Sequence, residues 1–165
     1  MFGDTIVALA SASGGGERAV LRISGPRAFD AAARVFSPSL RRERGQVDGH
    51  CSVAAQQWAC CALTMVAPRS FTGEDIVELH VPGSPLLVRL LQERLLQDSA
   101  ATGVREALPG EFTARACEHG RMDLAQAEGL LLLLHAQDRR EAQSAVQWLN
   151  GGLAAAASRV RAELQ

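Results

Sequence analysis

Charged side chains stand at three places in the sequence where regular structure would hold them in position. Arg22 lies within the β-forming run Ala19–Ser24, and Arg121 lies in a short connection between two predicted helices. Glu78 and His80 alternate with valine and leucine, so they share the polar face of a predicted strand. A guanidinium binds anions through a planar set of donors, and a carboxylate accepts N–H groups. These residue types therefore indicate binding of a ligand, or catalysis.

Each of these positions also has an ordinary structural explanation. An arginine within a strand is common on the exposed face of an edge strand. Glu78 and His80 would equally suit the solvated face of a sheet. Most surface arginines, including those that connect two helices, are only solvated. The residues alone leave both explanations open for Arg22, for the Glu78 and His80 pair, and for Arg121.

Strand patterns dominate the first half of the chain. They occur at Thr5–Ala10, at Ala19–Ser24, within His50–Val66, at Asp75–Val81 and at Val104–Leu108. A break near Gln56 and Gln57 divides His50–Val66 into two strands, and the charged segment Ser37–Gly49 predicts a loop. The glycine run Gly14–Gly16 would join the first two strands as a hairpin. No Gly-Lys-Ser/Thr follows it, because the chain contains no lysine, so these residues hold no Walker-type nucleotide site.

Two helices are predicted between the strands. One opens at Gly25-Pro26, and its apolar residues recur at helical spacing as far as Phe36. The other begins at Ser84-Pro85, a favourable cap followed by a favourable first residue. Both have an apolar side that suits packing against a sheet.

The last third of the chain is predicted to be helical. Glu111–Glu118 has helical composition, and Gly120 suits the left-handed residue that ends a helix. Asp123 and Gln126 predict a capping box, from which a helix should run over Leu124–Asn150. Its first half is apolar nearly all round, so we expect it to be buried. A further helical segment should follow to the end of the chain.

Composition limits the function classes. The 165 residues are 47% hydrophobic and carry a net charge of -1, which suits a globular domain and gives no basic footprint for direct nucleic-acid binding. The four cysteines form no C-x-x-C pair, which argues against a zinc site and a disulfide framework and favours a reducing, cytoplasmic compartment. The apolar runs, such as Leu130–Leu134, are too short to cross a bilayer. We therefore expect no metal site and no membrane contact.

Apolar residues beyond those that one small sheet can cover predict a homodimer. Trp58, Cys60 and Leu63 are assigned to a strand face, and the last helix begins with a leucine-rich segment. Surface of this kind is typical of association between copies of a chain.

Four stretches, in their order and spacing, resemble the N-terminal domain of the tRNA modification GTPase family MnmE/TrmE. They are Asp4–Ala8, Leu21–Gly25, Ser70–Asp75 with Glu78, and Pro109–Glu128. The resemblance implies an α/β fold of α+β type, a mixed β-sheet with flanking helices like the folate-binding fold of the glycine-cleavage T-protein. It implies that residues 1–119 form a folate-binding and dimerisation domain and that residues 120–165 begin a central helical domain.

The resemblance also implies a site and partners. Arg22, Glu78 and Arg121 match the family's positions for binding a tetrahydrofolate derivative, formyl-tetrahydrofolate, and no catalytic residue is assigned. GTP, Mg and K belong to a G domain that these residues lack, so this chain alone should not be catalytic. The parent would act with a flavin-dependent partner of the MnmG/GidA type in carboxymethylaminomethyl modification of the tRNA wobble uridine.

Two alternatives remain beside this interpretation. One is a free-standing folate-dependent aminomethyltransferase, although the T-protein is roughly twice this length or more, beyond one compact domain of this size. The other is a structural dimerisation domain whose folate site has decayed. The second is favoured by departures from the family pattern, in the glycine run, at Pro82-Gly83-Ser84, and at Arg121 where lysine is more usual.

Overall fold

A computed structural model describes residues 3–12, 16–97 and 99–150 of the chain. The chain divides into two compact units, Met1–Arg115 and Ala116–Gln165. The glycine run Gly14–Gly16 is described only at Gly16, so the predicted form of that loop lies outside the described residues. The division of function between residues 1–119 and 120–165 stays a prediction.

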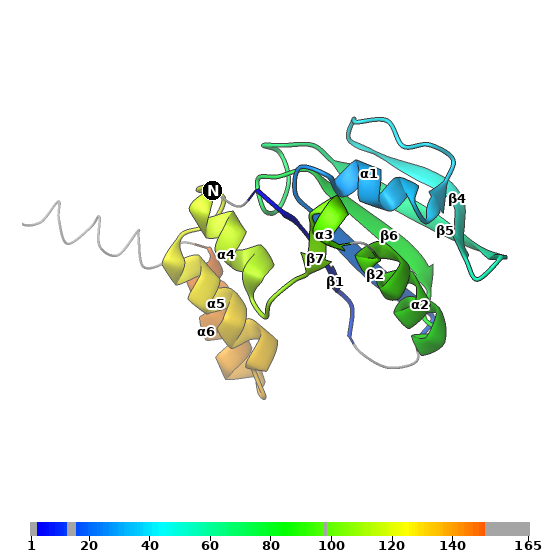
Figure 1. Cartoon of the computed structure of the whole chain (residues 1–165). Coiled ribbons are helices and arrows are strands. Elements are labelled where there is room, and N and C mark those ends of the chain that lie inside the picture. The colour runs from blue at the N-terminus through cyan, green and yellow to red at the C-terminus, as the bar shows by residue number, and fades with distance from the viewer. Residues whose placement is uncertain (1–2, 13–15, 98, 151–165) are drawn as a thin grey trace, which may run out of the picture. The chain divides into compact units, whose positions relative to one another are not determined.

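The first unit is built on one mixed sheet (Figure 1). Its seven described strands lie in the order β3-β4-β5-β6-β2-β1-β7. β7 is parallel to β1, and the other neighbours are antiparallel. The strands are β1 (Thr5–Leu9), β2 (Arg18–Ser24), β3 (Phe36–Ser37), β4 (Gly45–Val53), β5 (Gln56–Met65), β6 (Ile76–Pro82) and β7 (Val104–Glu106). The α/β class, with a mixed sheet and flanking helices, is confirmed.

Helices cover one face of this sheet (Figure 1). They are α1 (Ala28–Ala33), α2 (Pro85–Leu96) and the short α3 (Ser99–Thr102). Ser84 caps α2 by accepting a hydrogen bond from the backbone N–H of Leu87 at 3.5 Å, as the Ser-Pro start predicted. Leu91 and Leu95 of α2 are fully buried in the core cluster, so the apolar stripe of this helix faces the sheet.

The alternation of β2 and β6 places the charged side chains on the face away from this core. Leu21 and Leu79 are fully buried in the core cluster, whereas Arg22, Glu78 and His80 alternate with core residues and point to the other face. The predicted polar face is therefore confirmed. β2 lies between β6 and β1, so the explanation of Arg22 as an edge-strand residue was wrong.

One prediction about the β4–β5 hairpin was wrong, since the segment Ser37–Gly49 is a loop only in part and β4 begins at Gly45. The predicted division of His50–Val66 into two strands is confirmed. The turn between them lies at Ala54 and Ala55, directly before Gln56, with φ of 52° and 60°. Two-residue hairpin turns of this kind require positive φ at both positions and usually contain asparagine or glycine. The two alanines therefore did not mark the exact position of the turn in the sequence.

Two further assignments in the first unit need correction. The helix after Gly25-Pro26 begins only at Ala28 and ends at Ala33, so Phe36 belongs to β3 and not to a helix. Side chains at successive positions of a strand point to opposite faces. Leu63, which lies an odd number of positions after Trp58 and Cys60 in β5, therefore faces away from both. Trp58 and Cys60 pack against the core cluster.

The second unit contains an antiparallel-type pair of helices, α5 (Leu124–His135) and α6 (Arg139–Leu149), preceded by α4 (Glu111–Glu118), which begins in the first unit. The capping box is confirmed: Asp123 Oδ1 accepts from the backbone N–H of Gln126 at 2.7 Å, and Gln126 Oε1 accepts from the backbone N–H of Asp123 at 2.9 Å. A Cβ on Gly129 would lie 2.8 Å from the Cβ of Trp148. The absent side chain therefore allows α5 and α6 to approach closely.

The prediction of one continuous helix over Leu124–Asn150 was wrong. Asp138 caps a new helix by accepting hydrogen bonds from the backbone N–H groups of Arg140 and Glu141, at 2.7 and 2.9 Å. An aspartate in this position competes with helix continuation because its side chain satisfies the first free N–H groups.

The expected burial of the first half of the predicted helix, the part that forms α5, was also wrong. Leu131, Leu132 and Leu134 are 58%, 50% and 73% exposed, and Gly129 is the buried residue of this helix. The helical segment predicted after Asn150 lies outside the described residues. Within the described part, no helix is both long and apolar enough to cross a membrane.

Candidate ligand-binding site

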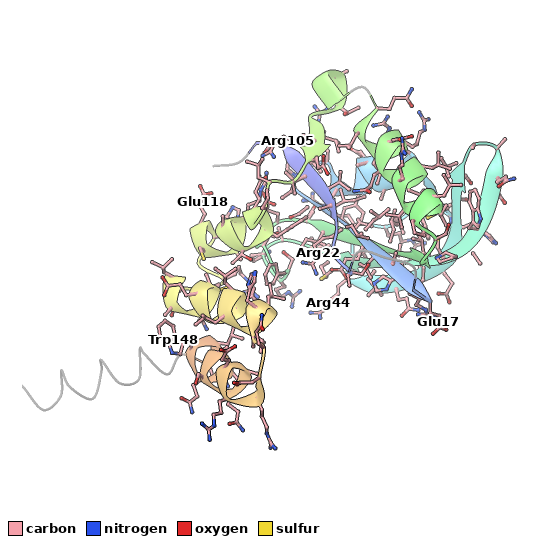
Figure 2. The ribbon with its side chains drawn as sticks, turned by 90° about the horizontal axis from the view of Figure 1, so that it is seen from below. Glu17, Arg22, Arg44, Arg105, Glu118 and Trp148 are labelled. Carbon is pink, nitrogen blue, oxygen red and sulfur yellow. The ribbon has the colours of Figure 1, made fainter. Side chains whose placement is uncertain are left out.

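Arg22 and Glu78 form an ion pair on the open face of the sheet. They stand directly opposite each other in the antiparallel register of β2 and β6. Arg22 Nε donates to Glu78 Oε1 at 2.7 Å, and the two side chains are 26% and 13% exposed. Arg22, which lies on β2, is labelled in Figure 2. The register thus joins two of the predicted site residues that are far apart in the sequence.

Two phenylalanine rings fix the guanidinium of Arg22. Its Cζ lies 5.4 Å from the ring centroid of Phe71 and 5.5 Å from that of Phe112. Phe71 belongs to the loop before β6, and Phe112 to the first turn of α4. Cation–π contacts at such distances stabilise by about 0.5–2 kcal/mol each, and more where water is excluded. The cation is therefore restrained by two elements besides its own strand.

His80 adds an unpartnered polar atom beside the pair. Its Nε2 lies 3.6 Å from Glu78 Oε2, which is longer than a hydrogen bond. The same Nε2 is buried and has no hydrogen-bond partner among the described residues. Buried polar atoms are nearly always paired, so this nitrogen is suited to a water or to a polar atom of a ligand.

An open pocket of about 600 Å³ adjoins His80 on the same sheet. Its lining includes Arg18, Asp48, His50 and Cys61, which come from β2, β4 and β5. Pockets for small molecules commonly have volumes of about 300–1,000 Å³ and combine apolar walls with a few polar groups. The face that holds Arg22 and Glu78 therefore continues into a space that a small molecule could fill.

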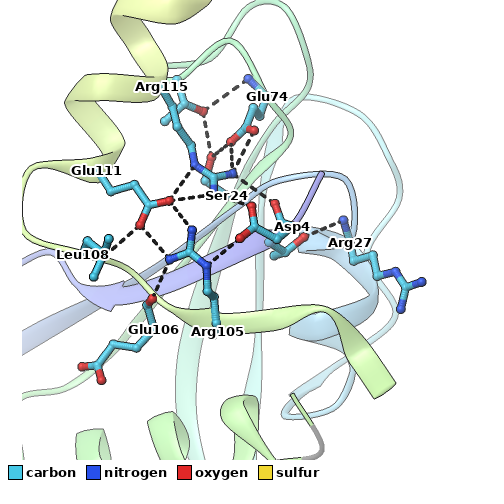
Figure 3. A network of polar contacts seen from close by, with 11 residues as sticks. Asp4, Ser24, Arg27, Glu74, Arg105, Glu106, Leu108, Glu111 and Arg115 are labelled. Carbon is cyan, nitrogen blue, oxygen red and sulfur yellow. Dashed lines mark hydrogen bonds and ion pairs between the residues drawn. The ribbon is translucent and has the colours of Figure 1, made fainter. Parts of the chain in front are cut away.

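A buried arginine organises the loops next to this face (Figure 3). Arg115 is fully buried, and its guanidinium contacts three carboxylates: Asp4 at 2.8 Å, Glu74 at 3.0 Å and Glu111 at 2.9 Å. Ser24 also donates to Glu74, at 2.7 Å. A buried cation is stable only when its charge is paired and its donors are used, and here both conditions are met.

Arg105 extends this network toward the surface (Figure 3). It is 38% exposed and donates to Asp4 at 2.5 Å and to Glu111 at 2.6 Å. The network therefore ties the start of β1, the loop before β6, the end of β7 and the first turn of α4. Glu74 and Glu111 lie close in sequence to Phe71 and Phe112, so the network also positions the rings that hold Arg22.

The network gives folding a defined dependence on acid. Hydrogen bonds from Arg105 lower the pKa of Glu111 from 4.5 to about 2, against the opposing effect of burial and with help from the Leu108 N–H and Arg115. Burial opposes, but hydrogen bonds from Arg105 and Arg115 outweigh it and lower the pKa of Asp4. Carboxylates with depressed pKa stabilise the fold above their unfolded pKa, and this contribution disappears as the pH falls through the folded pKa.

We expect the free energy of unfolding to fall between about pH 4.5 and about pH 2. The whole shift of Glu111 would correspond to about 3 kcal/mol, and we expect roughly half because solvent screens the partly exposed Arg105. Urea unfolding across this range measures the effect. In Glu111→Gln the same acid titration should be shallower, and an equal slope in the two proteins would contradict the role given to Glu111.

Arg121 follows the end of α4 in the second unit. Gly120 has a φ of 65°, as its place at the helix end predicted, and the backbone N–H of Arg121 donates to the carbonyl of Ala116 at 2.8 Å. Arg22 and Glu78 belong to the first unit. The structure thus brings two of the three predicted residues into contact, and the part of Arg121 in the site stays a prediction.

Sequence reasoning missed the aromatic and buried-charge parts of this site. Phe71, Phe112 and Glu74 lie within the motifs that carry the family resemblance, but their types gave no sign of contact with Arg22 or Arg115. Arg115 fits an ordinary helical pattern. Among the described residues, no group of three or more histidine, cysteine, aspartate or glutamate side chains could hold a metal ion.

The chain matches a known protein family. A family model described as "GTP-binding protein TrmE N-terminus" matches residues 5–121. Proteins named tRNA modification GTPase MnmE from Synechococcus sp. (strain CC9902), Symbiobacterium thermophilum and Dinoroseobacter shibae are 42%, 39% and 45% identical to the chain. The alignments cover 98%, 98% and 91% of the chain, and 37%, 36% and 34% of those proteins. The chain thus spans a little over a third of the length of the curated relatives it matches.

Proposed function

The chain belongs to the TrmE (MnmE) family of tRNA modification GTPases, and from this premise we propose that it is a folate-binding and dimerisation module. Arg22 and Glu78 bind the folate, together with Arg121. The observation that supports this most directly is the Arg22–Glu78 pair, held on an open sheet face at 2.7 Å. Titration of formyl-tetrahydrofolate into the chain tests the proposal, and saturable binding is the expected result.

The residues present are chemically suited to a reduced folate. A pterin offers adjacent N–H groups, which a carboxylate such as Glu78 can accept in pairs. The glutamate tail carries negative charge, which an arginine fork can bind. Phe71 and Phe112 restrain Arg22 before any ligand arrives, so little side-chain entropy is lost on binding. When bound, the folate would supply a one-carbon unit, while these residues bind and orient it.

The role of the whole protein follows from its relatives. Their printed name is tRNA modification GTPase, and we propose that the parent of this chain acts in tRNA modification. The finer proposal is carboxymethylaminomethyl modification of the wobble uridine, together with a flavin-dependent MnmG-type partner. Residues 1–119 would then be the folate-binding and dimerisation domain, and residues 120–165 the start of a helical domain. GTP would bind in a part of the parent outside these residues.

We expect the chain to form a homodimer. The exposed leucines of α5 provide apolar surface that favours association. At a concentration on the order of 50 µM, well above the Kd of about 1 µM that corresponds to about 8 kcal/mol, sedimentation equilibrium should give twice the chain mass. A reducing agent must be present, so that intermolecular disulfides do not mimic the dimer. The chain mass alone at that concentration would contradict this prediction.

One observation favours a structural alternative. Arg22 and Glu78 already satisfy each other, so the pair could serve only to join β2 and β6. In that case substitution of either residue would lower the melting temperature while folate binding was absent from the start. Folate binding by the unaltered chain therefore separates this alternative from the main proposal.

A further inference from the structure

Two cysteine thiols meet between neighbouring strands of the first unit. Cys51 on β4 stands opposite Trp58 on β5, and Cys60 lies two residues after Trp58, on the same face of the hairpin. Their sulfur atoms are 3.0 Å apart. A sulfur–sulfur bond is about 2.05 Å long, so the two atoms need to approach by only about 1 Å to form one.

We propose that Cys51 and Cys60 are an oxidisable thiol pair, which a hydroperoxide converts into an intramolecular disulfide. The site is separate from Arg22 and Glu78, and it does not depend on folate binding. Disulfides of reducing compartments are usually transient and redox-sensing, and a pair of free thiols already in contact is suited to that behaviour.

The two cysteines differ in the way that such a reaction requires. Cys60 is half-buried, whereas Cys51 is fully buried, so a small reagent meets Cys60 first. The contact with Cys51 lowers the pKa of Cys60 against the effect of burial, and the same contact, with burial, raises the pKa of Cys51. Because the thiolate is the reactive form, Cys60 is the attacking sulfur and Cys51 the resolving one.

The chemistry balances in two steps. The Cys60 thiolate attacks one oxygen of hydrogen peroxide, the O–O bond breaks, hydroxide leaves, and Cys60 becomes a sulfenic acid. The Cys51 sulfur then attacks the Cys60 sulfur, the S–O bond breaks, and the hydroxyl leaves with the Cys51 proton as water. The peroxide is reduced, and the two thiols are oxidised to the disulfide.

The other two cysteines, Cys61 and Cys117, can be removed so that only the proposed pair reacts. Cys61 follows Cys60 directly, so its side chain points to the opposite face of β5, and Cys117 lies in the second unit. The test therefore uses the full chain with Cys61→Ser and Cys117→Ser, exposed to stoichiometric hydrogen peroxide, then denatured and alkylated. Chymotrypsin cleaves after Trp58, which separates Cys51 from Cys60 in the sequence.

The expected product is a chymotryptic pair joined through Cys51 and Cys60, with two hydrogen atoms lost and no alkylation at either cysteine. Reduction should release both peptides. In Cys60→Ser the protection of Cys51 should vanish completely. In Cys51→Ala the first equivalent of peroxide should leave Cys60 as a sulfenic acid, and a second equivalent should convert it to a sulfinic acid. Circular dichroism verifies that each variant is folded.

Two results would overturn the proposal. In the first, the folded Cys61→Ser/Cys117→Ser chain keeps Cys51 fully alkylatable after Cys60 has been oxidised. In the second, neither Cys51 nor Cys60 of that folded chain reacts at peroxide concentrations that oxidise a free thiol control.

Discussion

Replacement of Arg115 by methionine should lower the free energy of unfolding by about 3–5 kcal/mol, because it leaves buried carboxylates without their cation. Glu74 and Glu111 are 9% and 6% exposed, and both contact the guanidinium. Methionine has similar length but no charge and no donors. Since a domain of this size has a total stability of about 5–15 kcal/mol, we expect a large fall in the urea midpoint.

A matched substitution controls for the loss of an arginine as such. Arg89 pairs with Glu93 on the surface of α2 at 2.8 Å, with 78% and 56% exposure, so Arg89→Met should leave the urea midpoint unchanged. The double variant Glu74→Gln/Arg115→Met should be less destabilised than the two single effects added, because removing both charges avoids an unpaired one. Equal midpoints for Arg115→Met and the unaltered chain would contradict a structural role for the network.

The second large effect concerns the ligand. Substitution of Glu78 by glutamine should weaken binding of formyl-tetrahydrofolate roughly ten- to a hundredfold, since a charged hydrogen-bond acceptor contributes about 1.5–3 kcal/mol. Glutamine keeps the size of the side chain and an acceptor for Arg22 Nε, so the strand pair should stay intact. Arg22→Ala should weaken binding by a similar factor and should also release the two phenylalanine rings.

The response of Arg121 tests its part in the site separately. If it acts as a point charge, Arg121→Lys should leave the folate affinity close to that of the unaltered chain, since lysine keeps the cation. Arg121→Ala should then weaken binding. A bidentate contact would make the lysine substitution costly as well, so the two variants together define how this residue is used.

The polar face of the sheet was predictable, because alternation within a strand is local information. Leu21 and Leu79 mark the buried face, and the residues between or beside them must point the other way. That Arg22 stands directly opposite Glu78 was not predictable from periodicity. It requires β2 and β6 to be neighbours, and no local pattern specifies a partner 56 residues away.

The buried-charge network was even harder to predict from the sequence. Arg115 reaches Asp4 across 111 residues of sequence, and a charged residue in a helix is normally solvated. The exact residues of the turn, Ala54 and Ala55, were not predictable for a different reason, since alanine is not among the residues that usually form such turns. Tertiary structure decided each of these features.

The exposure of the α5 leucines likewise could not be predicted from the pattern of the helix alone. A helix that is apolar all round is expected to be buried, yet Leu131 and Leu134 are 58% and 73% exposed. Exposed apolar surface of this kind favours association, and the homodimer proposed above would cover it.

The most direct test of the proposed folate site is calorimetric titration of formyl-tetrahydrofolate into the unaltered chain, Glu78→Gln and Glu93→Gln. Glu93 is an exposed carboxylate on α2, and α2 packs on the face of the sheet opposite to Glu78, so its variant should bind like the unaltered chain. We expect saturable binding to both of these proteins and a roughly ten- to a hundredfold weaker affinity for Glu78→Gln. Equal affinity in all three folded proteins, or no binding to the unaltered chain, would contradict the proposed folate site.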